Sequence, residues 1–213
     1  TLHEVFCSTV ADEVLRSHGR AVIVMANNVF NHANDHLDFA NSVSKILEDH
    51  GKFIFEMPYW LSMVESGRFV DMVYHEHVSY FTVKGVKNLL DQVGMEIESF
   101  KVVDYHGGSL RVVARKKTLL PRLPEIEQAI EWETQCGIYD LQFYQNLEKK
   151  FKENRNRWLA EFYALKEQDP DAVIIGVGAA AKANTWLNWH GLDHTMLHCI
   201  TDSSEFKQGK YTP

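Results

Sequence analysis

The side chains best suited to proton chemistry stand together at Tyr74-His75-Glu76-His77. Histidine titrates near neutral pH, and a neighbouring carboxylate can orient it and raise its basicity. A tyrosine hydroxyl can donate a hydrogen bond to a substrate oxygen. These residue types beside one another point to a site that moves a proton, within a segment running from Asp71 to Phe81.

Two other interpretations of this segment remain open. The chain contains 11 histidines, so some of them can fall together without a shared function. If the segment is a strand, His75 and His77 point to one face and could bind a metal ion. No cysteine or acidic cluster nearby completes a coordination shell, and we predict no metal site here.

The composition is typical of a folded globular protein with an acidic balance. Of 213 residues, 45% are hydrophobic and 24% are charged, and the formal net charge is −7. This length allows one large domain or two small ones. Because binding of nucleic acid requires a concentrated positive surface, the net charge argues against nucleic acid as a main partner. A local basic patch for one small anionic ligand remains allowed.

The cysteines and the ends of the chain bear on its compartment. Cys7, Cys136 and Cys199 are widely spaced and odd in number, which fits a reducing compartment and neither a disulfide framework nor a zinc site. No apolar run is long enough to span a membrane and no signal peptide is recognisable, so we expect a cytoplasmic protein without a membrane partner.

The chain starts at Thr1 without methionine and stops soon after an expected strand, so we expect a piece of a longer protein.

The first half of the chain alternates apolar runs with helical periodicity, which predicts an α/β fold. We expect a helix over 8–18 with Ser8 as its cap, and a second helix from Leu37 that ends at Gly51. The runs 21–26 and 53–56 are continuous and apolar, which is typical of strands buried on both faces of a parallel sheet. A strand, a helix and a strand joined by short connections predict a right-handed parallel crossover.

The second half adds further elements of the same kinds. We expect a helix over 84–93 that stops at Gly94, and an antiparallel pair of strands, 95–104 and 109–115, around Gly107-Gly108. Residues 116–124 contain two prolines and predict a linker. The stretch 125–167 carries an apolar stripe at helical spacing, which predicts one or two long helices whose stripe packs against other elements. The remaining pattern predicts a strand at 172–176, a helix through Trp189 and a strand at 196–200.

Three loops follow expected strands, at the edge where open α/β sheets bind ligands. They are residues 27–32, 56–59 and 176–182. The first two belong to neighbouring strands, so His32, Glu56 and Tyr59 could face one cleft. His32 and Glu56 are equally explained as residues at a helix entry and a strand end.

Glycines and cations in the later part of the chain could bind an anion. Gly176 and Gly178 follow a strand and open a helix, so a phosphate could approach the backbone N–H groups there, and Lys182 adds a positive charge. Ala181 stands where the dinucleotide fingerprint has its third glycine. Tight packing of the strand on the helix explains the two glycines equally well. Arg111, close to Gly107-Gly108, is suited to a phosphate or a carboxylate.

Taken in order, these segments resemble the S-adenosylmethionine (SAM)-dependent C-methyltransferases that act on nucleotide-linked deoxysugars. The resemblance covers nearly the whole chain. It rests on the stretches 26–32, 53–59, 74–81, 106–111, 176–185 and 207–213, among which Tyr-His-Glu-His and Gly-Val-Gly-Ala-Ala-Ala-Lys are the most specific.

The resemblance implies a partial domain set. Members of the family have an N-terminal zinc-binding module, a central methyltransferase sheet and a C-terminal Rossmann-like domain. By this comparison residues 1–116 are the later part of the SAM-methyltransferase domain, 117–168 are a linker with long helices, and 169–213 begin the C-terminal Rossmann-like domain. The expected fold is therefore α/β, with a partial Rossmann-like methyltransferase sheet, a long helical connector and the start of a second Rossmann-like α/β unit. Zinc belongs only to the absent N-terminal module.

The resemblance also implies a mechanism. A proton next to a ketone on the sugar is removed, and the enolate attacks the methyl sulfonium of SAM. His77 is then the base, Glu76 orients or polarises it or binds the sugar, and Tyr74 hydrogen-bonds the substrate oxygen. His32 is the second candidate for handling the proton.

Further roles are implied for the binding of the substrate and the cofactor. The substrate-binding residues are Lys182, Arg111, Gly176, Gly178 and Tyr59, the first four holding the nucleotide diphosphate. Asn27 and Asn28 are expected to contact SAM. The glycine-rich SAM loop and the acidic residue for the ribose are not in this chain, so the SAM pocket is incomplete and we expect this chain alone to be inactive.

Two other function classes stay open. A nicotinamide-dependent oxidoreductase could use the loop at Gly176, with Asp202 as its acidic residue. A non-catalytic fragment that binds a sugar nucleotide is the other alternative. In every case we expect a small-molecule partner and a monomer or weak homodimer.

Overall fold

The computed structural model describes residues 1–67, 72–118 and 123–212. The fold is α/β, as predicted. The chain divides into two compact units: unit 1 comprises Thr1–Phe69 and His75–Ile138, and unit 2 comprises Val70–Tyr74 and Tyr139–Pro213. The domain boundaries expected after residues 116 and 168 remain predictions. No helix in the described part of the chain is both long enough and apolar enough to cross a membrane.

Unit 1 contains a mixed sheet of four strands. Their order is β1 (Ala21–Asn27), β2 (Leu47–Pro58), β4 (Ser109–Lys116) and β3 (Met95–Val103). The strands β1 and β2 are parallel, and β4 is antiparallel to both β2 and β3. The predicted parallel pair and the predicted antiparallel pair are therefore both confirmed.

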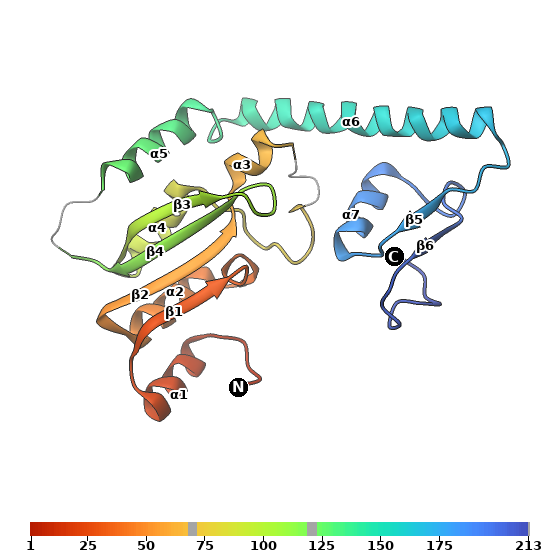
Figure 1. Ribbon diagram of the computed structural model, residues 1–213. Helices are drawn as coiled ribbons and strands as arrows, with labels where there is room; N and C mark the ends of the chain where they lie inside the picture. The colour runs from red at the N-terminus through yellow and green to blue at the C-terminus, as the bar shows by residue number, and fades with distance from the viewer. Residues whose placement is uncertain (68–71, 119–122, 213) are drawn as a thin grey trace. The chain divides into compact units, whose positions relative to one another are not determined.

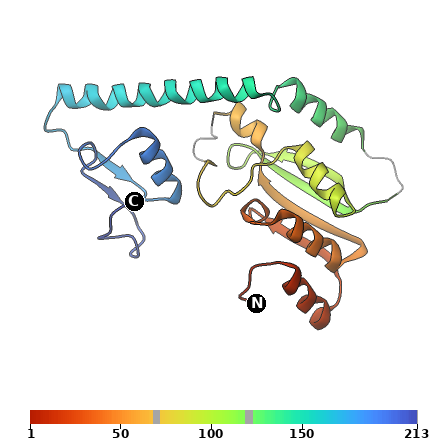
Figure 2. The ribbon, with the colours of Figure 1, turned by 180° about the vertical axis from the view of Figure 1, so that it is seen from behind.

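Two helices cover one face of this sheet. The helices α2 (His36–Ile46) and α4 (Val83–Gln92) lie behind the strands in Figure 1 and in front of them in Figure 2. The core beneath them is aromatic, with Phe30 at 5.3 Å from Phe55 and 5.7 Å from Phe81 between ring centroids. Because Phe81 is buried in this core, it fixes the chain just after the Tyr74–His77 segment.

Two predicted helix boundaries are wrong in detail. The helix α1 spans Ser8–His18 as expected, but its N-cap is Cys7 rather than Ser8. The helix α2 ends at Ile46, and Gly51 lies inside β2 instead of stopping the helix. A Cβ atom at Gly51 would lie 2.9 Å from Leu47 Cδ2 and 3.0 Å from the Ala21 carbonyl oxygen. This glycine therefore permits the close approach of two strands.

The burial predicted for β1 is also wrong. Val22, Ile23 and Met25 expose 60%, 54% and 65% of their surface. Among the described strands β1 pairs only with β2, so it is an edge strand of this sheet. A continuous apolar run predicted burial on both faces, but an edge position leaves much of that surface uncovered.

Among the helical elements that follow, α4, α5 and α6 were predicted and the short helix α3 was not. The helix α4 ends next to Gly94, which has a left-handed φ of 67°. The short helix α3 (Trp60–Glu65) follows β2. The predicted long helices are α5 (Pro124–Gln135) and α6 (Leu141–Gln168), although part of the predicted linker, residues 119–122, lies outside the described residues.

The apolar stripe predicted on these helices is only partly buried. Ile126 and Leu147 are buried as expected, whereas Trp158 exposes 41% of its surface. The prediction that the stripe packs against other elements therefore holds for some of its members only.

Unit 2 contains a second α/β element. The strands β5 (Ile175–Val177) and β6 (Cys199–Thr201) are parallel, and α7 (Ala181–His190) connects them. Both strands are shorter than predicted. The run before α7 is also less buried than predicted, with Val173 and Ile175 exposing 64% and 50% of their surface.

Candidate active site

The turn after β1 determines where His32 lies. Asn28 adopts a left-handed backbone with a φ of 51°, and its N–H donates to the Glu56 carbonyl oxygen at 2.7 Å. This hydrogen bond ties the end of β1 to the end of β2. The chain then enters the short helix η1 (Phe30–His32), where buried Phe30 anchors the turn in the aromatic core. His32 is thus held at the carboxyl end of the parallel strands.

The Tyr74–His77 segment is a turn and not a strand. Residues 74–76 form a bend and a turn, and the His75 and Glu76 side chains are 72% and 50% exposed. The two side chains approach each other to 3.9 Å. The metal interpretation required a strand, and among the described residues no group of three or more His, Cys, Asp or Glu is placed to hold a metal ion. Asp71 of this segment lies outside the described residues.

His77 and His32 lie together although 45 positions separate them in the sequence. Their ring centroids are 5.0 Å apart in an edge-to-face arrangement. A backbone hydrogen bond from Ser79 N–H to the Asn31 carbonyl oxygen, at 3.3 Å, joins the same two segments. The structure therefore brings together the two histidines that sequence reasoning selected for proton handling.

Tyr80 contacts His77, and Trp60 contacts Tyr80; neither was assigned a role from the sequence. The Tyr80 ring lies 6.0 Å from His77 and 5.1 Å from Trp60 between ring centroids. The backbone N–H of Trp60 donates to the Phe81 carbonyl oxygen at 3.0 Å, which holds Trp60 in place. Tyr80 could have been chosen from its position three residues after His77, whereas nothing in the sequence links Trp60 to this segment.

Glu56 and Tyr59 do not share a cleft with His32 in the way we expected. Glu56 is buried, and its Oε2 lies 2.7 Å from Arg111 Nε, its cross-strand partner on β4. The Tyr59 side chain is buried as well, and its hydroxyl donates to Glu133 Oε1 at 3.0 Å. The hydroxyl of Tyr59 is thus directed into the protein, which argues against its proposed contact with substrate.

Arg111 forms an ion pair inside the protein and is also partly exposed to solvent. Its Nε is committed to Glu56, but 54% of the side chain is exposed. The guanidinium therefore neutralises a buried carboxylate and still presents N–H groups to solvent. A role in binding an anionic substrate stays a proposal for Arg111.

In the glycine loop of unit 2, residues 176–182, backbone N–H groups are bonded to other groups of the protein. A Cβ atom at Gly176 would lie 3.0 Å from Ile200 Cγ1, so this glycine serves close packing of β5 on β6. The Gly178 N–H donates to the Thr201 carbonyl oxygen at 2.7 Å, and the Ala179 N–H donates to Asp202 Oδ2 at 2.8 Å. These two N–H groups, which we expected to hold a phosphate, are occupied here.

The carboxylate of Asp202 also accepts hydrogen bonds from within the protein. Hydrogen bonds from the Ser204 N–H, then from Lys207 and the Ala179 N–H, lower the pKa of its carboxyl group. Lys207 Nζ lies 3.3 Å from Asp202 Oδ2. A nicotinamide-dependent enzyme would need this carboxylate for a ribose, so the geometry favours a structural role for Asp202 over the oxidoreductase alternative.

Lys182 has a different environment, all of it within unit 2. Its ammonium lies 3.2 Å from Met72 Sδ and 5.7 Å from the centroid of the Tyr74 ring. In the described structure no carboxylate pairs with it. A partly buried cation packed against a thioether and a phenol ring remains available for an anionic ligand.

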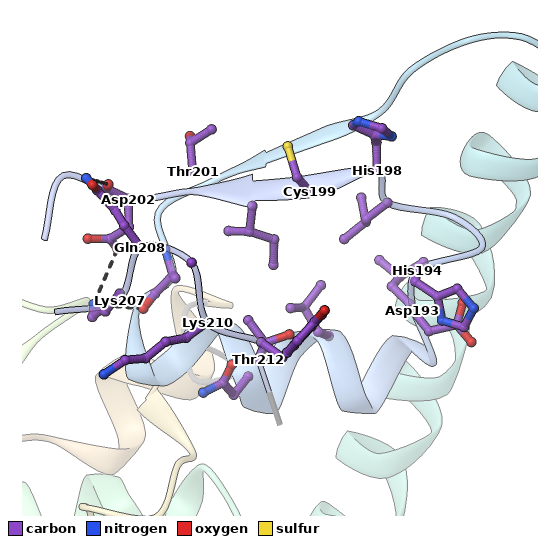
Figure 3. A pocket seen from close by; sticks show the side chains of 18 of the residues that line it. Asp193, His194, His198, Cys199, Thr201, Asp202, Lys207, Gln208, Lys210 and Thr212 are labelled. Atoms are coloured by element: carbon purple, nitrogen blue, oxygen red, sulfur yellow. Dashed lines mark hydrogen bonds and ion pairs between the residues drawn. The ribbon is translucent and has the colours of Figure 1, made fainter. Parts of the chain in front are cut away.

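Unit 2 also contains a pocket of about 910 Å³. Figure 3 shows Asp202 and Lys207 at one end of it and Asp193 and His194 at the other. Lys210 adds a second positive charge to the lining, whereas Gly176, Gly178 and Lys182 do not line this pocket. It is large enough for a small ligand.

Asn27 and Asn28, which we expected to contact SAM, lie at the end of β1. Asn27 is exposed and Asn28 half-buried at the carboxyl end of β1, the edge at which α/β sheets bind ligands. The left-handed backbone at Asn28 turns the chain away from the strand. The contact of these two residues with SAM stays a proposal.

Comparison with known proteins gives two family matches. A family model described as "C-methyltransferase C-terminal domain" matches residues 104–213, and one described as "Methyltransferase domain" matches residues 2–99. The C-methyltransferase NovU of Streptomyces niveus is 28% identical over 211 residues, which cover 98% of this chain and 49% of NovU. The chain therefore spans about half the length of this curated relative.

Solved methyltransferase structures match about half of the chain. CalO1, a methyltransferase in calicheamicin biosynthesis in its SAH-bound form, has a TM-score of 0.38 and 10% identity over 48% of this chain and 32% of its own. Magnesium protoporphyrin IX methyltransferase from Synechocystis with bound SAH has a TM-score of 0.38 and 10% identity, over 49% of this chain and 48% of its own.

Proposed function

Because the chain belongs to the C-methyltransferase C-terminal domain family over residues 104–213, we propose that it takes part in C-methylation of a nucleotide-linked keto-deoxysugar. The methylated carbon is the one next to the ketone. The methyl donor is SAM, and the substrate is a sugar joined to a nucleotide diphosphate. The presence of a methyltransferase domain match over residues 2–99 supports the choice of donor.

One observation carries this proposal: the imidazoles of His32 and His77 lie 5.0 Å apart at the carboxyl end of the parallel strands. A hydrogen next to a ketone is only weakly acidic, so its removal requires a base placed within hydrogen-bond reach. Neutral imidazole is a suitable base near neutral pH. Two half-buried imidazoles in ring contact provide a base and a neighbour that can accept or return the proton.

We assign the base to His77. Its ring stands between His32 and Tyr80, which restrict its orientation from two sides. His32 then serves as the second proton-handling group. When bound, SAM supplies the methyl group that the deprotonated carbon takes up, with Asn27 and Asn28 against one side of the donor.

Glu76 and Tyr74 keep supporting roles in the proposal. Glu76 is half-exposed in the turn, where its carboxylate can accept hydrogen bonds from sugar hydroxyl groups. Tyr74 can donate its hydroxyl hydrogen to the substrate oxygen that becomes the enolate, which stabilises the developing charge.

Lys182 and Arg111 are proposed to hold the anionic part of the substrate. The Lys182 ammonium lacks a carboxylate partner in the described structure, and the Arg111 side chain is 54% exposed. Arginine and lysine are the side chains that bind phosphate most readily. Gly176 and Gly178 shape the loop that precedes Lys182, and the Gly178 N–H is already bonded to the Thr201 carbonyl oxygen.

The test is methyl transfer by the complete protein to a nucleotide-linked keto-deoxysugar, followed by mass spectrometry of the sugar. We expect His77→Ala to lower kcat by about 10²- to 10⁴-fold, which is the usual contribution of a positioned base. The control is His50→Ala, an exposed histidine on β2. Equal activity of the two variants would remove His77 from the base role, and absence of methylation by the unchanged protein would refute the proposed function.

A further inference from the structure

Glu133 is a carboxylate buried without any exposed surface, on the face of α5 that meets the rest of unit 1. Burial of an ionised carboxylate is costly unless hydrogen bonds replace its water. Three donors surround it: the Tyr59 hydroxyl at 3.0 Å and the Val83 N–H on Oε1, and the Lys84 N–H at 3.1 Å on Oε2. Such a group demands an explanation beyond core packing.

Two of these donors are the first N–H groups of α4. The first N–H groups of a helix lack partners within the helix. The next one, at Gly85, is satisfied by the Thr82 hydroxyl at 3.0 Å, so Glu133 and Thr82 together complete the N-terminus of α4. A negative charge at this end also interacts favourably with the helix dipole. Glu133 therefore determines where α4 begins, directly after the segment that carries His77.

The third donor connects Glu133 to the other side of the histidine pair. Tyr59 immediately precedes Trp60, and Tyr59 forms an isolated parallel bridge with Phe81. One carboxylate thus holds the residue before Trp60 and the residues that follow Phe81. Trp60 in turn contacts Tyr80, and Tyr80 contacts His77.

We propose that Glu133 is a positioning residue for the proposed proton transfer: it fixes Trp60 and Tyr80, and through them the ring of His77. This inference rests on the proposed function. It adds a residue from α5, 56 positions after His77 in the sequence, that touches neither substrate nor cofactor and still sets the geometry of the base.

The test replaces Glu133 by glutamine, which keeps the shape but presents an amide –NH₂ to N–H and O–H donors where the carboxylate offered only acceptors. Its matched control is Glu127→Gln, an exposed glutamate on the same helix with the same change of charge. The readout is NMR of the histidine ring protons across pH and of the tryptophan indole N–H signals, on the intact chain. His198 in unit 2 serves as an internal reference.

We expect Glu133→Gln to shift the Trp60 indole signal and the titration midpoint of His77, while His198 stays unchanged and Glu127→Gln shifts neither. In the methyl-transfer assay the same variant should lower kcat by up to about 10²-fold, as a small misplacement of a reacting group does, with an unchanged KM for SAM. A folded Glu133→Gln protein with unaltered His77 and Trp60 signals overturns the proposal. Since the NMR readout needs no methyl transfer, this outcome is distinct from failure of the proposed function.

If Glu133→Gln does not fold, Tyr59→Phe takes its place. This variant removes a single donated hydrogen bond and leaves the carboxylate and both helix N–H contacts. We then expect a smaller shift of the same Trp60 and His77 signals, and unchanged signals overturn the proposal in this case too.

Discussion

The imidazole of His36 lies in aromatic surroundings, 5.4 Å from the Phe30 ring and 5.2 Å from the Phe81 ring. Its buried Nε2 has no hydrogen-bond partner in the described structure. Burial disfavours the charged form, and it lowers the pKa of His36 below its usual value of 6.5. A histidine held neutral beside the proposed site therefore makes stability depend on pH.

The direction of this dependence follows from proton uptake. The unfolded chain binds a proton near the ordinary pKa, whereas folded His36 stays neutral to lower pH. The unfolded state therefore binds more protons in that window, and the free energy of unfolding falls as pH decreases below about 6.5 and levels off below the folded pKa. We expect His36→Leu to flatten this decline in urea unfolding measured at several pH values. An unchanged slope would contradict the assignment to His36.

Residue types together with the family resemblance were enough to select the histidines but not their neighbours. His32 and His77 were chosen because they stand at a strand end and in a cluster of proton-handling side chains, and they lie in contact. Tyr59 was chosen by the same reasoning, yet its hydroxyl bonds to Glu133, which is 74 positions away in the sequence. A partner this distant leaves no local pattern, so the commitment of Tyr59 could not be predicted.

Among the elements, the turn between β3 and β4 shows most directly why a particular residue is required. Gly108 has a φ of 114°, and a Cβ atom there would lie 2.3 Å from Ser62 Cβ on α3. Its carbonyl oxygen also accepts a hydrogen bond from Tyr59 N–H at 3.0 Å. The sequence predicted a turn at this glycine pair, and the structure adds that the turn packs directly on α3.

We expect Gly108→Ala to destabilise unit 1 more than Gly94→Ala does. Both positions have a positive φ, which costs about 1–3 kcal/mol for a residue other than glycine, but only Gly108 also meets a neighbouring side chain. Gly94 has nothing within 4 Å of its would-be Cβ and serves as the matched control. Urea unfolding of both variants measures the difference. Equal losses would show that the contact with Ser62 is readily relieved.

The kinds of elements were more predictable than their burial. Periodicity and turn residues located the longer helices to within a few residues, since both signals are local, whereas the short helices α3 and η1 were not predicted. The exposure of β1 and the shortness of β5 were not predicted, because they depend on which other strands and helices cover an apolar run. An apolar run shows that a strand can be buried. It does not show whether another strand or helix covers that strand.

At the scale of the whole molecule, the proposed base and Lys182 belong to different units. His32 and His77 are in unit 1, whereas Lys182 is in unit 2 together with Tyr74. Arg111, the other cation proposed for the diphosphate, is in unit 1 with the two histidines. Because Lys182 is proposed to hold the diphosphate, its contribution should appear in binding.

We expect Lys182→Ala to weaken binding of a nucleotide diphosphate sugar by about tenfold to a hundredfold, the usual value of one charged hydrogen bond. Isothermal titration calorimetry of the complete protein measures the Kd. The control is Lys149→Ala, an exposed lysine on α6 that pairs with Glu153. An unchanged Kd for the Lys182 variant would exclude this lysine from the substrate site.

The most direct test of the central claim is hydrogen exchange at the carbon next to the ketone, followed by NMR or mass spectrometry in deuterated water without SAM. Removal and return of this proton require the base but not the methyl donor. The account predicts exchange with the complete protein and His50→Ala, and a loss of about 10²-fold or more with His77→Ala. Exchange that persists in His77→Ala at the rate of the unchanged protein would contradict the assignment of His77 as the base.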